Sequence, residues 1–257
     1  MRTPLVIGNW KMNGSSRSST ALAEAVASGW GAFQGVECGV CPPFVHLAGI
    51  GAVLGGTELR LGAQDVSEFL PGAYTGETAA EMLLDLGLRF VIIGHSERRA
   101  LFGDTDLRIL AKLRRAQSVG LVPILCVGET LEERRAGVTE AVVSRQLDAV
   151  LTGPDAHSIL ANLVVAYEPV WAIGTGETAT PAQAQAVHAY IRNRLAGCDP
   201  QAAQATRLLY GGSVKPGNAP ELFAMPDIDG GLVGGAALQA GDFIAICAAA
   251  QARVAAS

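Results

Sequence analysis

Short β-rich segments alternate with longer helical patterns along the 257-residue chain, and this alternation restricts the possible fold more than any other feature of the sequence. Several of the β-rich segments are continuous apolar runs, which is typical of parallel strands buried on both faces of a sheet. The eight predicted strands are residues 5–8, 36–41, 59–63, 90–93, 122–127, 163–167, 208–210 and 231–233.

Helical signals lie between these segments. Apolar residues recur at helical spacing from Val143, and again two elements later from Ala184. Thr130, with a glutamate three positions later, has the pattern of a capping box and predicts the start of the first helix. Thr180, followed directly by proline, predicts the start of the second.

Eight strand–helix units without a proline- or serine-rich linker predict an α/β protein, a single-domain (β/α)8 barrel with eight parallel strands that spans residues 1–257. An open, doubly wound sheet is the alternative. That fold would place a G-x-G-x-x-G turn after the first strand. Residues 8–14 read GNWKMNG and lack this fingerprint, so the closed barrel is the preferred prediction.

The composition argues against several classes of function. A net charge of −5 disfavours nucleic-acid binding, which needs a basic face. No segment is apolar over the length of a membrane span or a secretory signal, so we expect no membrane association and a cytoplasmic location. Five cysteines do not suggest a disulfide framework. Cys38 and Cys41 have C-x-x-C spacing, but residues three apart on a strand face opposite sides.

Polar residues follow the predicted strands at the end where a barrel carries its functional site. Asn9 and Lys11 follow the first strand. His95 and Glu97 follow the fourth, and Glu168 follows the sixth. Taken singly, a lysine is most often a surface residue and a histidine often packs in a core. Together, a carboxylate, an imidazole and a cation indicate a catalytic site.

Glu168 is the strongest of these candidates. It follows the apolar run 164–167 and precedes Pro169, which favours an extended backbone, so its carboxylate should close a buried strand. We expect burial to raise the pKa of this carboxyl, a property suited to a general base.

Residues 211–213 and 234–235, which end the seventh and eighth strands, are rich in glycine. Backbone N–H groups at these two strand ends commonly hold a phosphate group in barrels. The neighbouring sequence has no metal-ligand spacing, so we expect neither a metal nor a cofactor. Carbanion chemistry would then be stabilised by His95, Asn9 and Lys11.

The segments that carry these features resemble the triosephosphate isomerase family. They are GNWKMN at 8–13, GAYTGE at 72–77, IGHSERR at 93–99, CVGE at 126–129, YEPVWAIGTG at 167–176, YGGSV at 210–214 and GLVGG at 231–235. The resemblance runs in order from about residue 5 to about residue 250.

The resemblance implies a TIM barrel enzyme that interconverts dihydroxyacetone phosphate and D-glyceraldehyde 3-phosphate, in glycolysis and gluconeogenesis, without a cofactor. It implies that Glu168 is the general base and that His95 is an electrophile kept neutral at a helix N-terminus. Lys11 would offset the substrate's negative charge, Asn9 would orient its oxygens, and Glu97 matches a family residue with a less settled catalytic part. The residues implied to hold the phosphate through backbone N–H groups are Gly174, Ser213, Gly234 and Gly235.

Two loops extend the resemblance. The first resembles a closing lid, formed by Pro169, Val170, Trp171, Ala172, Ile173, Gly174, Thr175 and Gly176. Residues 64–77 resemble the loop that joins two copies into a homodimer, with Thr75 reaching the partner. The loop tip, residues 68–71, is less polar than is usual in the family. Asp104 stands where the family usually has glutamate, and we expect the shorter side chain to weaken a buried polar contact near the interface.

Two other classes of function stay open from the residues alone. One is a different phosphate-binding barrel enzyme, such as another aldose–ketose isomerase or a lyase, which need not keep both His95 and Glu168. The other is a catalytically silent scaffold, which should have lost Lys11 or Glu168. All three residues are present.

Overall fold

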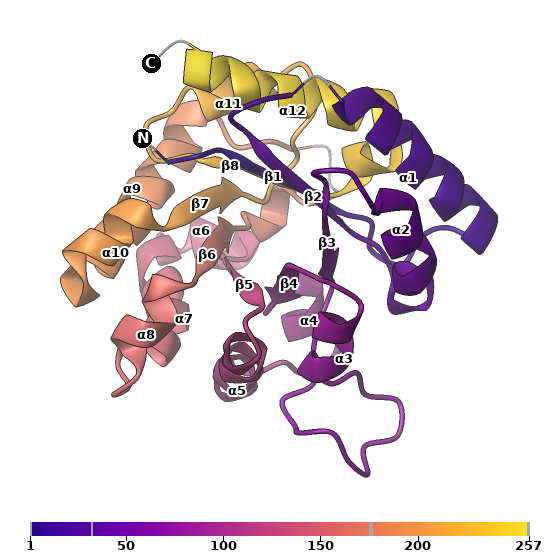
Figure 1. Cartoon of the computed structure of the whole chain (residues 1–257). Coiled ribbons are helices and arrows are strands. Elements are labelled where there is room, and N and C mark those ends of the chain that lie inside the picture. The colour runs from indigo at the N-terminus through magenta and orange to yellow at the C-terminus, as the bar shows by residue number, and fades with distance from the viewer. Residues whose placement is uncertain (1, 32, 175–176, 256–257) are drawn as a thin grey trace.

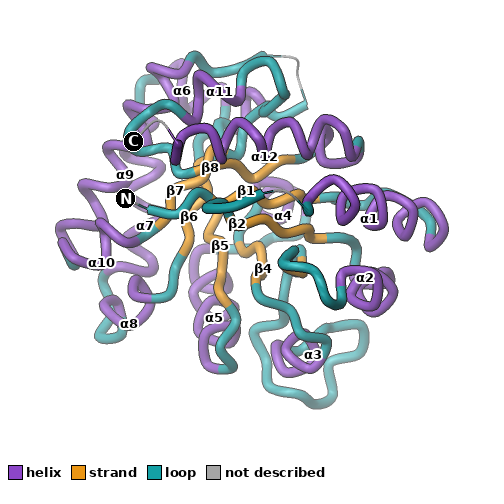
Figure 2. The backbone as a smooth tube through the Cα atoms, turned by 45° about the horizontal axis from the view of Figure 1, so that its top comes forward, coloured by secondary structure: helices purple, strands orange, loops and turns teal. Residues whose placement is uncertain are grey.

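A closed barrel of eight parallel strands, in sequence order, lies at the centre of the computed structural model, which describes residues 2–31, 33–174 and 177–255 (Figures 1 and 2). The strands are β1 (Leu5–Asn9), β2 (Glu37–Cys41), β3 (Arg60–Ala63), β4 (Phe90–Ile93), β5 (Val122–Val127), β6 (Val164–Tyr167), β7 (Arg207–Tyr210) and β8 (Gly230–Val233). The predicted (β/α)8 barrel is confirmed, and the alternative of an open sheet is wrong.

The barrel closes where the first strand meets the last. In the parallel pairing of β1 with β8, Leu5 lies opposite Gly230 and Gly8 lies opposite Val233. On its other side β1 pairs with β2, again in parallel. Closure leaves no strand of the sheet with an unpaired edge, and it directs the carboxyl ends of all eight strands to one mouth.

Helices surround the strands, as the tube view shows (Figure 2). The α-helices are α1 (Ser16–Trp30), α2 (Leu47–Leu54), α3 (Ala80–Asp85), α4 (Ser96–Leu101), α5 (Asp106–Ser118), α6 (Leu131–Arg135), α7 (Thr139–Leu151), α8 (Ala156–Ala161), α9 (Pro181–Cys198), α10 (Pro200–Ala205), α11 (Ala219–Phe223) and α12 (Ala240–Ala255). The described residues also form short 3-10 helices, which are η1 (Phe44–His46), η2 (Val170–Ala172) and η3 (Gly235–Leu238). Among the helices of the described ranges, none is long and apolar enough to cross a membrane.

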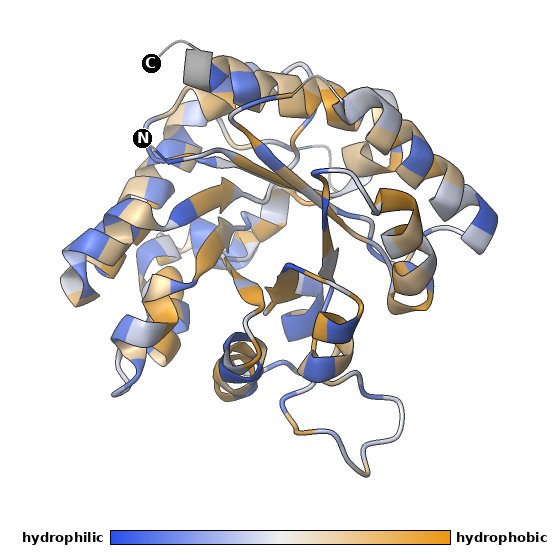
Figure 3. Ribbon diagram, viewed as in Figure 1, coloured by the Kyte–Doolittle hydropathy of each residue, from blue (hydrophilic) through white to orange (hydrophobic). Residues whose placement is uncertain are grey.

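The strands separate two apolar cores, and both of their faces are therefore hydrophobic (Figure 3). Along β1, Leu5 and Ile7 point into the barrel, whereas Val6 belongs to the core between strands and helices. In β2, Cys41 lies in the barrel interior and Cys38 in the outer core, 3.7 Å from the sulfur of Cys247. The prediction that Cys38 and Cys41 face opposite sides is confirmed.

Two helix starts were predicted from capping patterns. Thr180 caps α9, and its side-chain oxygen accepts from the backbone N–H of Gln183, as predicted. Thr130 forms the predicted capping box with Glu133, but the prediction of which helix it starts is wrong, because it caps the separate short helix α6 rather than the helix that contains Val143. Gly137, with φ +72°, ends the α6 turn, and α7 then begins at Thr139 without a side-chain cap.

Candidate active site

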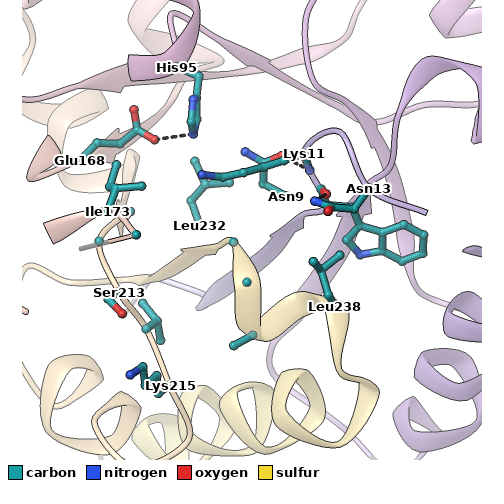
Figure 4. A pocket seen from close by; sticks show the side chains of 18 of the residues that line it. Asn9, Lys11, Asn13, His95, Glu168, Ile173, Ser213, Lys215, Leu232 and Leu238 are labelled. Carbon is teal, nitrogen blue, oxygen red and sulfur yellow. Dashed lines mark hydrogen bonds and ion pairs between the residues drawn. The ribbon is translucent and has the colours of Figure 1, made fainter. Parts of the chain in front are cut away.

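The carboxyl ends of the strands surround a cavity of about 510 Å³ (Figure 4). Its lining includes side chains or backbone from the ends of β1, β4, β6, β7 and β8. The predicted site residues that border it are Asn9, Lys11, His95, Glu168, Gly174, Ser213, Gly234 and Gly235. Glu97 lies one contact away, paired with Lys11.

Glu168 directly follows β6 and is 2% exposed. Its backbone N–H donates to the carbonyl oxygen of Val127 at 2.7 Å, which continues the pairing of β6 with β5. One carboxylate oxygen, Oε1, lies 2.9 Å from Nε2 of His95 (Figure 4). The other, Oε2, accepts the backbone N–H of Ser96 at 2.9 Å. Strand pairing and two side-chain contacts therefore hold the carboxylate in one position.

Two glycines allow the chain to approach Glu168 closely. A Cβ atom on Gly128 would lie 1.8 Å from the carbonyl oxygen of Glu168, closer than any side chain can come. A Cβ on Gly211 would lie 2.9 Å from Cγ of Glu168. These glycines let neighbouring strand ends enclose the carboxylate without displacing it.

His95 is the N-cap residue of α4, and its ring position follows from that role. Its Nδ1 atom accepts the backbone N–H of Glu97 at 3.2 Å, so Nδ1 carries no proton in this geometry. The ring proton then resides on Nε2, which donates to the Glu168 carboxylate. A neutral imidazole with this tautomer satisfies both contacts.

The two groups also change each other's pKa. Burial raises the pKa of Glu168, but the facing His95, the Ser96 N–H and Lys11 lower it by more, so that its pKa lies below the ordinary 4.5. The expectation that the pKa of Glu168 is raised is therefore wrong in this arrangement. Burial lowers the pKa of His95, and the Glu168 carboxylate outweighs it, leaving the His95 pKa above 6.5.

Lys11 follows β1 in a left-handed backbone conformation with φ +51°, which non-glycine residues seldom adopt. Its N–H donates to Oδ1 of Asn9 at 3.0 Å, and its carbonyl oxygen accepts Nε2 of Gln64 at 2.9 Å. Its Nζ lies 2.6 Å from Oε1 of Glu97. The backbone N–H and carbonyl groups of Lys11 are thus both hydrogen-bonded, which supports its unusual conformation. Its ammonium group is directed to the cavity (Figure 4).

Residues of three further loops also border the cavity. Ser213 follows β7, Gly234 follows β8, and Gly235 begins the 3-10 helix η3. Gly174 borders the same space from the predicted lid. The described residues contain no group of three or more histidine, cysteine, aspartate or glutamate side chains that could hold a metal ion.

The first part of the predicted lid is tied to the buried carboxylate of Glu129. Nε1 of Trp171 and the hydroxyl of Tyr167 donate to Glu129 at 3.0 and 3.1 Å. Arg134 donates to the same carboxylate at 3.2 Å, and its guanidinium lies 4.6 Å from the centre of the Trp171 ring. Pro169 precedes η2, which holds Val170, Trp171 and Ala172, and Ile173 and Gly174 border the cavity. Thr175 and Gly176 lie outside the described residues.

The predicted dimer loop, residues 64–77, lies between β3 and α3 and projects from the body of the barrel (Figure 1). Thr75 is exposed on it. Phe69 stacks on Tyr74 with 4.1 Å between ring centres, and Leu70 at the tip is 64% exposed.

Asp104, the predicted departure from the family, is buried and contacts two cations of its own chain. Its carboxylate lies 2.9 Å from Nζ of Lys112 and 2.9 Å from Nε of Arg98. The shorter carboxylate therefore still reaches two partners within this chain.

Sequence reasoning did not assign a role to Gln64 or Glu129. Gln64 contacts Lys11 across 53 positions of sequence, and no local pattern indicates such a contact. Glu129 is part of the matched CVGE segment, which was its only signal. Leu232 and Asn13 also border the cavity without having been predicted (Figure 4).

A buried carboxylate beside an imidazole at the mouth of a parallel barrel is the arrangement of an enzyme that moves protons on a small substrate. Comparison with known proteins shows which family of such enzymes the chain belongs to. The family model for triosephosphate isomerase matches residues 4–250, and the chain belongs to that family of isomerases.

Curated relatives named triosephosphate isomerase cover almost the whole chain. The protein of Thiobacillus denitrificans is 58% identical over 250 residues, which is 97% of this chain and 99% of that protein. The protein of Dechloromonas aromatica is 57% identical, over 97% of this chain and all of that protein. The protein of Nitrosococcus oceani is 56% identical, with the same coverage.

Proposed function

We propose that this chain interconverts dihydroxyacetone phosphate and D-glyceraldehyde 3-phosphate through an enediolate, as a step of glycolysis and gluconeogenesis. The observation that carries this proposal is the pairing of Glu168 with His95 in a barrel of the triosephosphate isomerase family. Lys11, His95 and Glu168 all border one cavity.

Glu168 is the proposed base. Its pKa below 4.5 keeps the carboxylate ionised at neutral pH in the free enzyme. When a substrate carbon lies between the carboxylate and the imidazole, Glu168 takes a proton from that carbon and returns it to the neighbouring carbon. Burial then works in favour of the transfer, because loss of the His95 contact leaves a desolvated carboxylate of higher basicity.

His95 and Lys11 are proposed to stabilise the negative charge that develops on the substrate oxygens. The Nε2 proton of His95, which now faces Glu168, would donate to one oxygen of the enediolate. Lys11 supplies positive charge and Asn9 sits beside it at the end of β1. Glu97, ion-paired with Lys11 at 2.6 Å, is proposed to orient the ammonium group.

The substrate phosphate is proposed to bind the backbone N–H groups of Gly174, Ser213, Gly234 and Gly235, which all border the cavity. Closure of residues 169–176 would exclude water from the enediolate and reduce its loss of phosphate. Tyr167, Trp171 and Arg134 all donate to the Glu129 carboxylate. These hydrogen bonds support the proposal that the N-terminal part of the segment stays fixed to the barrel.

We further propose a homodimer in the cytoplasm, formed through the loop 64–77 with Thr75 near the partner's site. The supporting observation is a set of exposed apolar side chains at this end of the barrel. They are Met12 (94% exposed), Val45 (85%), Leu70 (64%), Leu101 (75%) and Phe102 (61%). Apolar side chains of this size in one region favour a protein partner.

The direct test is turnover by the purified protein. Consumption of D-glyceraldehyde 3-phosphate is coupled to NADH oxidation by an auxiliary dehydrogenase that reduces dihydroxyacetone phosphate. Steady NADH loss supports the proposal, and its absence from folded protein rejects it. Incubation with sugar bisphosphates, followed by analysis of the products, reports a lyase instead.

A further inference from the structure

Lys215 borders the catalytic cavity from the chain between β7 and α11, two residues after Ser213 (Figure 4). The turn that carries both residues is closed by Asn218. Oδ1 of Asn218 accepts the backbone N–H of Lys215 at 2.8 Å, and its Nδ2 donates to the carbonyl oxygen of Ser213 at 2.9 Å. The backbone of Lys215 is therefore fixed relative to Ser213, one of the proposed phosphate-binding residues.

The side chain of Lys215 is exposed, and its ammonium group has no ion-pair or hydrogen-bond partner among the described residues. Lys11 is the other cation in the described lining of the cavity, and its Nζ lies 2.6 Å from Oε1 of Glu97. The charge of Lys11 is thus balanced by a contact, whereas the charge of Lys215 is not.

Two carboxylates border the same cavity. Glu168, whose pKa lies below 4.5, is ionised at neutral pH. Asp242, in the first turn of α12, is exposed. Without Lys215, these carboxylates would face the cavity with no cation except the one paired with Glu97, in a chain whose net charge is −5. Such a cavity would repel a phosphate monoester, which carries between one and two negative charges at neutral pH.

From these relations we propose that Lys215 is a substrate-attracting residue, whose unpaired charge draws the phosphate group of a triose phosphate into the cavity and toward the backbone N–H groups of the site. This inference rests on the proposed function. Lys215 acts before proton transfer, so its effect falls on KM and kcat/KM rather than on kcat. Salt screens exposed charges over about 10 Å at 0.1 M, so the effect weakens as ionic strength rises.

The salt dependence of kcat/KM for D-glyceraldehyde 3-phosphate tests this role. At an ionic strength of about 10 mM, Lys215→Gln should lower kcat/KM about three-fold through KM, with kcat unchanged. In about 0.3 M salt the difference from the parent should fall below about 1.5-fold. Lys215→Arg should keep the parent values, because it keeps the charge.

Asp242→Asn should change kcat/KM in the opposite direction. Removing this negative charge should raise kcat/KM about two-fold at low salt. The double variant Lys215→Gln/Asp242→Asn should return toward the parent value, because the net charge of the cavity lining is then the same as in the parent.

Arg89→Gln is the matched control. Arg89 is exposed directly before β4, at the opposite end of the strands from the catalytic cavity, and its side chain has no ion-pair partner among the described residues. The change lowers the net charge by the same one unit, and kcat/KM should stay within about 1.3-fold of the parent.

Equal kcat/KM in the parent and in Lys215→Gln at low salt would overturn the role of Lys215 and leave the isomerase proposal intact. The same holds for a loss that persists in 0.3 M salt or that Lys215→Arg shares, since the shape of the turn would then be responsible. An equal loss in Arg89→Gln would assign the effect to overall charge and also overturn it. A parent protein without turnover would instead overturn the proposed function.

Discussion

Gln64 donates its side-chain amide to the carbonyl oxygen of Lys11 at 2.9 Å and to that of Cys41 at 2.8 Å. One amide thus joins the chain after β3 to the ends of β1 and β2. Because Lys11 has φ +51°, its conformation needs such support, and Gln64 is proposed to position the cation without touching the substrate.

Replacing Gln64 with alanine should lower the free energy of unfolding by about 1–2 kcal/mol, since the part-buried carbonyl groups of Lys11 and Cys41 each lose a donor. It should also raise KM by about ten-fold, equivalent to about 1.4 kcal/mol of lost binding. Urea unfolding and steady-state kinetics measure the two effects.

Gln117→Ala is the matched control for this change. Nε2 of Gln117 also donates to two carbonyl oxygens, those of Ile159 and Asn162, both at 2.8 Å and away from the cavity. It should lower stability without changing KM. Equal KM values in the two variants would show that Gln64 has only a structural part.

Shortening the base while keeping its charge separates position from binding. Glu168→Asp should lower kcat by about 100-fold or more and leave KM nearly unchanged, because the carboxylate withdraws from the substrate carbon by roughly one bond. Glu132→Asp, on the exposed face of α6, should leave both constants unchanged. An effect on KM alone would contradict the role of Glu168 as the base.

His188 should make the stability of the fold depend on pH. It lies on α9, fully buried against the rings of Tyr167 and Tyr210, and burial lowers its pKa from 6.5 to about 4. Between these two values the unfolded chain binds a proton that the folded chain does not. The free energy of unfolding should therefore fall as pH falls, by about 2 kcal/mol between pH 7 and pH 5.

Urea unfolding at the two pH values measures this dependence. His188→Gln should be less stable than the parent at pH 7 but should lose less stability between pH 7 and pH 5. The control is His157→Gln, whose side chain is 70% exposed, and it should keep the parent's dependence. If His188→Gln keeps the full dependence as well, another group is responsible.

The proposed dimer is tested at the tip of the loop 64–77. Leu70→Glu places a charge on an exposed apolar side chain, so light scattering should report a monomer in place of a dimer. Val138→Glu changes a side chain that is 40% exposed at the start of α7 and should leave the assembly unaltered. A parent protein that is itself monomeric would reject the proposal.

The barrel was predictable because strands that are buried on both faces appear in the sequence as continuous apolar runs. The ranges 90–93 and 122–127 were predicted to the residue, since both are apolar throughout and buried on both faces. Strands such as β7 begin one residue earlier than predicted. Arg207 pairs with Val164 through its backbone, and hydropathy does not report that pairing.

The site was predictable as a set of residues but not as a set of contacts. Strand-end positions alone brought Asn9, His95 and Glu168 together. The direction in which the Glu168 pKa shifts could not be predicted. Burial raises this pKa and the His95 contact at 2.9 Å lowers it, and the direction depends on which of the two effects is larger. The sequence indicates that this strand end is buried, but it does not give the distance between the two side chains.

The pairing of Leu5 in β1 with Gly230 in β8 has a consequence for synthesis on the ribosome. Lys11, His95 and Glu168 all leave the ribosome before the strand that closes the barrel does. Until β8 arrives, β1 presents an unpaired edge to other nascent chains. A translation pause before residue 230 would therefore favour aggregation.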